Sequence, residues 1–429
     1  MPNYSVKFAK SIEDIGLDTW QRIAGCDYPF MRYEFLHALE TARPNNLEKQ
    51  QSEAACSRRS GWQPSHALVS DEHGLVAVMP LYLKYHSYGE YIFDWAWAEA
   101  YLRNGLDYYP KLLAAIPYSP VTGPRIAIDP ATDAKVTFDS QDLMKWLAGA
   151  MQEYCTSIGA SSFHLLYPEG DVSRSLAAQG VTARHSYQYH WFNSTNGEQG
   201  TLNKPEDFRQ ETMFDDFEHF CAHLKSRKRK VILKERREVL QQGITIERLV
   251  GDAITPEIWQ RFYQFYQLTY AKRSGHGGYL NEGFFQQIGQ TMADQLMLVV
   301  AKKDNEVIAG ALNFFSSTTL YGRYWGCTEE AEFLHFEACY YQGIEFCIEK
   351  NLQRFDAGAQ GEHKIQRGFR PVDTHSNHWI AHPGFREAIN DYMDQERQQN
   401  QQHMDLAAQK LPFSPLQTTE IKSATYNKY

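Results

Sequence analysis

The 429-residue chain carries 43 basic and 52 acidic residues, and its net charge of −9 argues against a general nucleic-acid-binding protein, which needs clustered Lys and Arg to neutralise phosphates. The length predicts two domains, and the hydrophobic share of 43% is ordinary for a globular protein. Seven widely spread cysteines without a CxxC pair predict neither a disulfide framework nor a zinc ribbon. Because the chain has no apolar signal core and no long apolar run, we expect a cytoplasmic protein with no transmembrane segment.

Two stretches of the chain, 65–91 and 298–326, each have the pattern of a strand, a tight turn and a second strand. They align without a gap: Asp71 falls on Asp304, and Tyr88–Tyr91 falls on Tyr321–Tyr324 as a Tyr-Gly-x-Tyr strand. This repetition predicts an internal duplication. The second stretch continues into helical periodicity at 333–351 and a short buried strand at 352–357, and strands alternating with helices predict a mixed α/β fold.

The segment between the two halves, 215–243, is predicted to be one helix, capped by Asp215 or Asp216 and ended by Gly243. Residues 225–237 hold eight basic residues and one acid. Such a run is either a solvated helical face or a site for an anion or phosphate, with contacts from Arg227, Lys228 and Lys230. The predicted boundaries are an N-terminal domain at 1–195, a C-terminal domain at 196–390 that opens with this basic helix, and a tail at 391–429 made of a terminal helix and a loose end.

Several long blocks together resemble the FemAB-like group of bacterial GNAT-type N-acyltransferases, often labelled peptidoglycan biosynthesis or recognition. They include "GWQPSHALVSDEHGLVAVMPLYLKYHSYGEYIFDWAWAEAY", "LKSRKRKVILKERRE", "YGRYWGC", "LHFEACYYQGIEF" and "GAQGEHKIQRGFRP". The resemblance implies two tandem GNAT-like (acyl-CoA N-acyltransferase-like) domains. It also implies transfer of an acyl or aminoacyl group, from acyl-CoA or aminoacyl-tRNA, to an amine acceptor in an interdomain cleft. The acceptor would be a small molecule, a peptide or a cell-envelope precursor, and the basic helix could bind tRNA.

A late segment of Fem enzymes, similar to Phe-Lys-Lys-Gly-Phe-Gly-Gly, corresponds here to residues 365–371. Gly368 and Phe369 match it, and Arg367 can stand where one lysine does. The other lysine position holds Gln366, so the resemblance implies that the lysine's role has moved to Arg367 or Lys364.

The polar loop at 355–371 also carries groups suited to acyl transfer, which needs a base, an oxyanion stabiliser and contacts for donor phosphates. Lys364 and Arg367 would supply positive charge, and Glu362 or His363 would be the base. Backbone N–H groups beside the glycines would donate to an anion. The alternative is a surface loop of salt bridges and turn hydrogen bonds.

Residues of the second half supply further candidates. Glu337 is a possible base or amine anchor, and Tyr340 lies three positions on, on the same helical face. Arg323 and Trp325 alternate with Tyr324 and are expected on one strand face, lining the cleft unless Arg323 pairs with an acid.

The histidines of "VDTHSNHWIAHPG" are spaced for zinc only if the segment is helical, whereas Trp379 and Ile380 look like the start of a strand. We therefore expect no metal and interpret His378 as a cleft or core histidine.

In the first half, a group of polar and aromatic residues forms either an acceptor pocket or an aromatic core with satisfied polar tips: Glu90, Asp94 and Trp97, together with Lys84, Tyr109 and Lys111. The alternative to an enzyme is a non-catalytic binding protein that retains the double fold.

Overall fold

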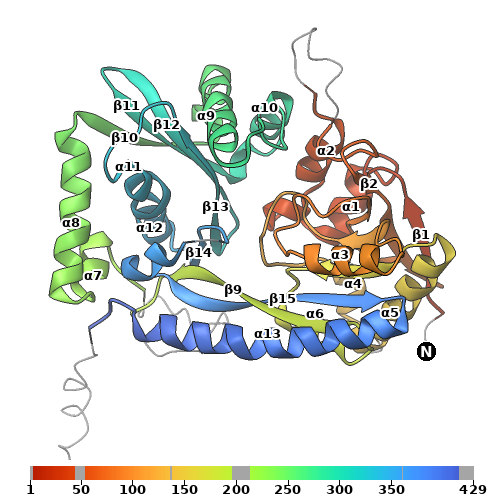
Figure 1. The fold of residues 1–429 in the computed structure, drawn as a ribbon. Helices are drawn as coiled ribbons and strands as arrows, with labels where there is room; N and C mark the ends of the chain where they lie inside the picture. The colour runs from red at the N-terminus through yellow and green to blue at the C-terminus, as the bar shows by residue number, and fades with distance from the viewer. Residues whose placement is uncertain (1–2, 44–53, 136–137, 196–212, 360, 415–429) are drawn as a thin grey trace, which may run out of the picture.

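The computed structural model describes residues 3–43, 54–135, 138–195, 213–359 and 361–414, and within them the chain forms two β-sheets covered by helices (Figure 1). The predicted mixed α/β fold is therefore confirmed. The larger sheet has the order β10 (Ile244–Val250), β11 (Leu296–Lys303), β12 (Glu306–Phe315), β13 (Thr319–Cys327), β14 (Arg354–Asp356), β9 (Thr182–Phe192), β15 (Arg370–Ile380), β8 (Ser162–Leu166), β6 (Lys111–Ala114), β5 (Leu81–Lys84) and β2 (Trp62–Pro64).

The smaller sheet and the helices pack around this large sheet. The smaller sheet has the order β1 (Ser5–Ala9), β3 (His66–Asp71), β4 (Gly74–Met79) and β7 (Ala127–Ile128). The α-helices before the basic segment are α1 (Leu17–Ala24), α2 (Tyr33–Thr41), α3 (Trp95–Arg103), α4 (Pro130–Asp133), α5 (Ser140–Ser157) and α6 (Gly170–Ala177). Those after it are α9 (Pro256–Ser274), α10 (Glu282–Thr291), α11 (Leu334–Phe336), α12 (Gln342–Glu349) and α13 (Pro383–Gln409). None of the helices within the described ranges is long and apolar enough to cross a bilayer.

The two halves of the chain share the large sheet. Strand β9, which precedes the predicted boundary at residue 195, lies between β14 and β15 of the second half. Strand β15 in turn pairs with β8 of the first half, in a register that sets His378 against His164. The two halves are therefore joined by backbone hydrogen bonds as well as by side chains, and the division at 195 stays a prediction.

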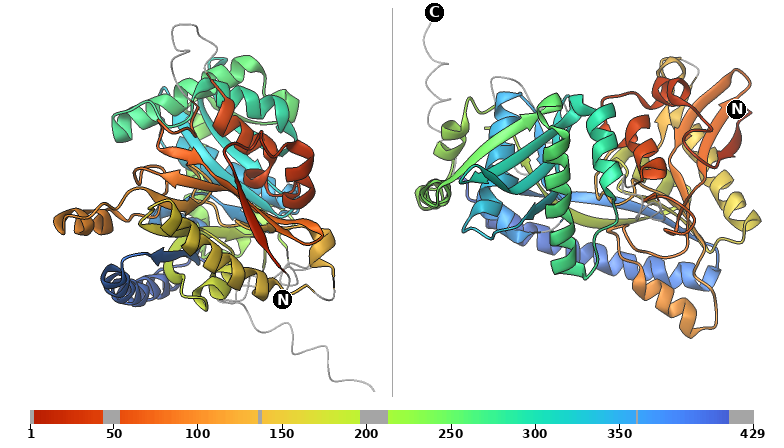
Figure 2. Two further views of the ribbon diagram at one scale, coloured as in Figure 1. Left: turned by 90° about the vertical axis from the view of Figure 1, so that its right-hand side faces the viewer. Right: turned by 90° about the horizontal axis from the view of Figure 1, so that it is seen from above.

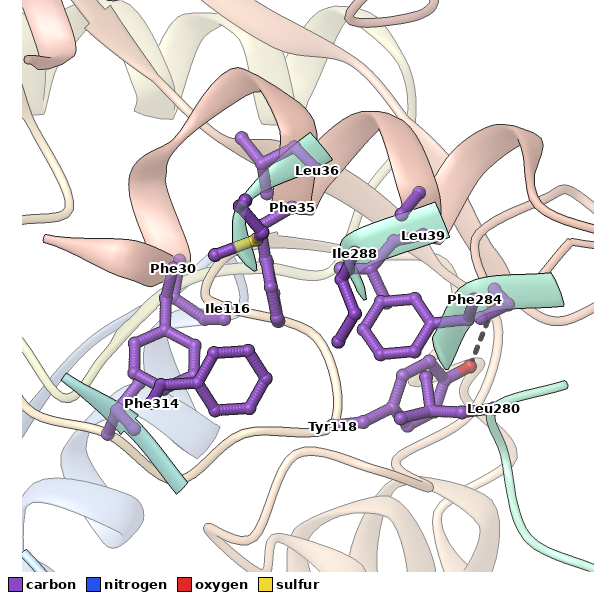
Figure 3. Close-up of a cluster of buried hydrophobic side chains, with 14 of the residues drawn as sticks. Phe30, Phe35, Leu36, Leu39, Ile116, Tyr118, Leu280, Phe284, Ile288 and Phe314 are labelled. Carbon is purple, nitrogen blue, oxygen red and sulfur yellow. Dashed lines mark hydrogen bonds between the residues drawn. The ribbon is translucent and has the colours of Figure 1, made fainter. Parts of the chain in front are cut away.

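The main hydrophobic core also lies between the halves. Phe35 on α2 packs edge-to-face on Phe284 of α10 with ring centroids 5.6 Å apart, and Phe30 lies 5.1 Å from Phe314 of β12 (Figure 3). All four side chains are completely buried. Burial of each such ring contributes roughly 1.5–3 kcal/mol, so this cluster holds the halves in one orientation.

The predicted repeat is only partly present. Both hairpins form, β3–β4 around Glu72–His73 and β11–β12 around Asp304–Asn305. The prediction of a second matching strand is wrong, because Tyr321–Tyr324 lies in β13 whereas Tyr88–Tyr91 is an irregular turn. Gly89 and Tyr91 have φ of 80° and 62°, a left-handed conformation that no strand allows.

The basic segment is two helices rather than the predicted one. Asp216 caps α7 (Phe217–Ala222) by accepting from the His219 N–H at 2.6 Å, and α8 spans Ser226–Gln241. The helices are separated where residues 412–413 contact the backbone between them. Leu224 forms a β-bridge with Phe413, and the Lys225 N–H donates to Pro412 O at 2.8 Å. Figure 2 shows these green helices at one end of the molecule in the view from above.

The terminal helix, α13, begins at Pro383, before the predicted boundary at 391, and runs along β9 and β15 (Figure 1). Residues 415–429 of the predicted tail lie outside the described residues. The expectation that Trp379 and Ile380 start a strand is also wrong, because they end β15.

Candidate active site

The candidate site lies where two neighbouring parallel strands separate. Strands β13 and β14 pair from Thr319–Arg354 to Tyr321–Asp356, after which β14 ends and β13 continues to Cys327. The carboxyl ends of parallel strands are a common place for ligands because loops and side chains meet there. Here Asp356 is the last residue of β14, and the polar loop follows it.

A buried ion cluster occupies this strand end. The Arg323 guanidinium contacts the Asp356 carboxylate with an NH2–Oδ2 distance of 2.5 Å, and the two side chains are 2% and 1% exposed. The Gly358 N–H donates to Asp356 Oδ1 at 3.0 Å, and His190 Nε2 of β9 lies 3.6 Å from the same oxygen. Burial alone would raise the pKa of Asp356, but Arg323 and His190 outweigh it and hold that pKa below its usual range.

Lys364 lies beside this cluster, on the 3-10 helical turn Glu362–Arg367 that ends at the left-handed Gly368. The side chain is buried, and Nζ donates to Ala357 O at 2.9 Å and Gly358 O at 2.6 Å. Burial lowers the pKa of Lys364 to about 7, with Arg323 acting in the same direction and Asp356 opposing. The amine is therefore poised to change charge near neutral pH.

Residues of the loop that holds Lys364 also line a cavity of about 420 Å³. Its walls come from both halves of the chain: Tyr91, Ile92, Phe93, Tyr167, Arg184, Ser186, Tyr187, Gln188 and Tyr189 from the first, and Ala359, Gly361, Glu362, Thr374, Ser376, Glu396 and Asn400 from the second. One side chain connects the cavity wall to the ion cluster. Gln188 lines the cavity, and its Oε1 lies 3.1 Å from His190 Nε2. A pocket of aromatic rings with a few polar groups suits a small ligand.

The two predicted bases of the loop, Glu362 and His363, contact different residues. Glu362 is exposed, lines the cavity and lies 3.4 Å from His403 Nε2. His363 Nε2 is 2.8 Å from the Tyr340 hydroxyl. Burial, followed by Arg367, lowers the pKa of His363, so its imidazole is neutral at pH 7.

Arg367 is held in the interior by Glu235 of α8, with both NH2–Oε distances at 2.8 Å, and its guanidinium stacks 3.5 Å over the Phe336 ring. Glu337, in the π-helical turn Glu337–Tyr341, accepts from Arg236 at 3.0 and 3.1 Å and from Gln342 at 2.7 Å. These contacts occupy both carboxylate oxygens of Glu337, and they tie α8 to the core.

The predicted shared face of Arg323 and Trp325 is wrong. Across from β12, Leu312 pairs with Tyr324 and Asn313 pairs with Gly322, so Arg323 is the extra residue of a β-bulge. The bulge sends Arg323 over the rings of Phe30 and Tyr321, whereas Trp325 packs in the cluster on the opposite side of the sheet. The second alternative for Arg323, pairing with an acid, is the one observed.

The predicted residues of the first half form a separate buried cluster. Lys111 Nζ donates to Glu90 at 2.8 Å and also contacts Asp94, and all three side chains are buried. Burial raises the pKa of Glu90 to about 7, against the opposing effect of Lys111. The Lys84 amine is 3.9 Å from Glu90, and burial lowers its pKa to about 7.

His378, on β15 of the second half, contacts His164 on β8 of the first half. Its Nδ1 lies 2.7 Å from Nδ1 of His164, and its ring packs edge-to-face on Trp97 at 5.0 Å. Burial lowers the pKa of His378 well below its ordinary value, followed by an effect of His164 in the same direction. This is a neutral histidine in the interface between β8 and β15.

Helix α8 contacts the candidate loop through side chains. Arg227 and Lys230 are exposed, and Lys228 Nζ donates to Gln366 Oε1 at 2.7 Å. Gln366, the position at which the chain departs from the Fem segment, therefore contacts the basic helix.

Sequence reasoning missed Asp356, His190 and Gln188, which link Lys364 and Arg323 to the cavity. Asp356 carried a recognisable signal, since it is a carboxylate at the predicted end of a buried strand. His190 and Gln188 carried none, because their strand reaches the site only through the pairing of β9 with β14 and β15.

This arrangement defines a mixed α/β protein with a buried amine and ion pair at a strand end. The model of the FemAB-like family, described as peptidoglycan biosynthesis/recognition, matches residues 11–415, and the chain belongs to that family. No curated protein matches the chain.

Solved structures similar to the chain include FemX, with 12% identity, a TM-score of 0.45, and coverage of 82% of this chain and 96% of FemX. The C-terminal domain of a putative lysylphosphatidylglycerol synthetase from Agrobacterium fabrum is 11% identical at a TM-score of 0.46, covering 84% of this chain and 90% of that one. A tandem GNAT protein from the clavulanic acid biosynthesis pathway is 9% identical at a TM-score of 0.40, and the match covers 89% of this chain and 99% of that one.

Proposed function

We propose that the protein is an N-acyltransferase that moves an acyl or aminoacyl group to an amine acceptor, with Lys364 as the general base. Membership of the FemAB-like family supports the reaction class and an acceptor from peptidoglycan biosynthesis. The proposal depends above all on one observation: a buried lysine amine bonded to backbone carbonyls, on a loop whose Ala359, Gly361 and Glu362 line a cavity of about 420 Å³. This burial lowers the pKa of Lys364 to about 7.

The hydrogen bonds of Lys364 support the role of a base. A neutral amine has two N–H groups, and Nζ has two acceptors, Ala357 O and Gly358 O. With both N–H groups engaged, the lone pair of the neutral amine is free to accept a proton. Nζ would take a proton from the acceptor ammonium before attack, or from the tetrahedral intermediate after it. The new C–N bond replaces the thioester bond of acyl-CoA or the ester bond of aminoacyl-tRNA, and the CoA thiol or the tRNA ribose hydroxyl leaves.

The ion pair beside Lys364 has a positioning role in this proposal. Asp356 fixes the start of the loop through the Gly358 N–H, and Gly358 O is one of the two acceptors of Nζ. Arg323 neutralises Asp356, so the carboxylate does not stabilise a protonated Lys364 as strongly as an unpaired one would. Glu337 and Arg367 have no part in the proton transfer, because their polar groups are bonded to Arg236 and Glu235.

Both donors implied by the family are tested directly. The full chain is incubated with labelled acetyl-CoA or with labelled aminoacyl-tRNA, and with an amine-bearing peptidoglycan stem peptide, and transfer is followed by mass spectrometry. We expect transfer from one of the two donors, and a loss of about 10²–10⁴-fold in Lys364→Met and Lys364→Arg, which have no neutral amine. Lys145→Met, at an exposed lysine of α5 that does not line the cavity, is the matched control and should retain activity.

Normal transfer by folded Lys364→Met would disprove the assignment of the base. If the wild type binds the peptide and transfers from neither donor, the alternative of a non-catalytic binding protein is favoured. RNA that copurifies with the chain and is released by salt would indicate tRNA, in contact with Arg227 and Lys230 of α8.

A further inference from the structure

A cluster of two histidines and an aspartate lies on the strands that the two halves exchange, away from the candidate active site. His185 of β9 is directly opposite His375 of β15 in the antiparallel register, and Asp373 lies two residues before His375. Side chains alternate along a strand, so His375 and Asp373 share one face, whereas the cavity-lining Thr374 and Ser376 share the other. The cluster is therefore separated from the cavity by the sheet.

The three side chains converge on one carboxylate oxygen. Asp373 Oδ2 lies 3.0 Å from His185 Nδ1 and 3.8 Å from His375 Nε2, and the two imidazole rings meet edge-to-face at 5.0 Å. The potential ligand atoms all lie within 4.8 Å of one another. Two ligands of one tetrahedral zinc ion lie roughly 3.4 Å apart, as bond lengths of about 2.0–2.2 Å require. Rotation of the exposed Asp373 side chain would adjust its distances to the two imidazoles, and binding would also require the two imidazole rings to move closer together.

Nε2 of His375 faces the start of helix α6. Helix α6 approaches with Gly170, where a Cβ atom would lie 3.4 Å from that nitrogen. The nearest positive side chain is Arg174, which forms an ion pair with Asp171. The other ring nitrogen, Nδ1 of His375, is buried and has no hydrogen-bond partner among the residues that the structure describes.

We propose that His185, Asp373 and His375 form a binding site for a divalent transition-metal ion of the zinc type. Two imidazoles and one carboxylate are ligands that suit Zn²⁺ and leave a position for water, whereas Mg²⁺ prefers oxygen ligands alone. His185 belongs to the first half of the chain, and the other two residues belong to the second. A bound ion would therefore link the two halves across the β9–β15 pair.

The proposed site departs from the expectation of no metal, and its set of ligands differs from the histidines whose spacing would suit zinc in a helix. Among the three histidines of the segment 375–382, His378 is bonded to His164, and His382 caps α13 by accepting from the Phe385 N–H. The ligand that completes the set with His375 is His185, which only strand pairing could identify.

Isothermal titration of the chelator-treated full chain with Zn²⁺ tests the proposal. We expect one Zn²⁺ bound per chain and no heat of binding with Mg²⁺. The unfolding temperature should rise with the logarithm of the Zn²⁺ concentration, because the ion binds only the folded chain. His185→Gln, Asp373→Asn and His375→Gln should each weaken Zn²⁺ binding at least tenfold.

The control is His73→Gln, because His73 is an exposed histidine 3.8 Å from the carboxylate of Glu72 and should be dispensable. Circular dichroism without metal shows whether each variant is folded. Equal Zn²⁺ affinity in the wild type and the three folded variants would overturn the proposal, as would the absence of one-to-one binding. Co²⁺ gives a second measurement on the wild type alone: a strong visible band of four- or five-coordinate Co²⁺ supports the site, and only the weak octahedral spectrum contradicts it.

Discussion

Replacing Asp356 with Asn would leave the Arg323 guanidinium buried without its counter-charge. The two side chains are 2% and 1% exposed and 2.5 Å apart, so neither water nor a nearby surface group compensates for the change. An amide can still accept from the Gly358 N–H, and the loop should keep its local shape. Removal of one partner from a buried ion pair costs about 3–5 kcal/mol, and we expect the free energy of unfolding to fall by that amount.

Urea denaturation followed by tryptophan fluorescence measures this loss. The control is Glu247→Gln, which removes the partner of Lys302 in a pair whose side chains are 50% and 35% exposed and should cost about 1 kcal/mol or less. Because the pKa of Asp356 is lowered in the folded state, its contribution is present above the unfolded pKa near 3.9 and is lost as the pH falls below it. The difference between wild type and Asp356→Asn should therefore shrink in acid. Equal small losses in the two variants would refute the buried-charge argument.

Two further predictions test the packing. Phe284→Ala should lower the free energy of unfolding by about 3–5 kcal/mol and keep a single urea transition, because Phe284 packs on Phe35 across the halves; two separate transitions would contradict the shared core. Gly326→Ala should destabilise by about 1–3 kcal/mol, since its Cβ would lie 2.1 Å from the backbone oxygen of Phe265. The control is Gly149→Ala in α5, whose new Cβ meets no atom within 4 Å and which should be neutral or stabilising by up to about 1 kcal/mol. A lower melting temperature for Gly149→Ala than for Gly326→Ala would count against the packing of α9 on β13.

Individual helices and strands were predicted from the sequence better than the contacts between segments that lie far apart in the chain. The two hairpins, the helix before Asn351 and the buried strand at Arg354–Asp356 all form, because hydrophobic periodicity and turn residues act over a few positions. The break between α7 and α8 was not predictable in this way, since Pro412 and Phe413 cause it from almost 190 residues away. The β-bulge at Arg323 was missed for a similar reason, because it depends on the register with β12.

The same distinction applies to the candidate site. Lys364, Arg367 and Glu362 attracted attention because the loop is short, polar and framed by glycines, and two of the three turn out to be buried. Glu235, which pairs with Arg367, and Asp356 and His190 of the adjacent ion cluster come from three different elements. Pairing over such sequence distances is a property of the folded sheet and leaves no local pattern.

The titration of the Lys364 amine tests the central claim most directly. Chain labelled with ¹³C-lysine allows the Cε resonance of Lys364, assigned by its absence from Lys364→Arg, to be followed against pH without any substrate. We expect a midpoint near pH 7, as burial of the amine requires, well below the ordinary lysine value of about 10.4. A Lys364 midpoint close to 10.4 would contradict its role as a base at neutral pH.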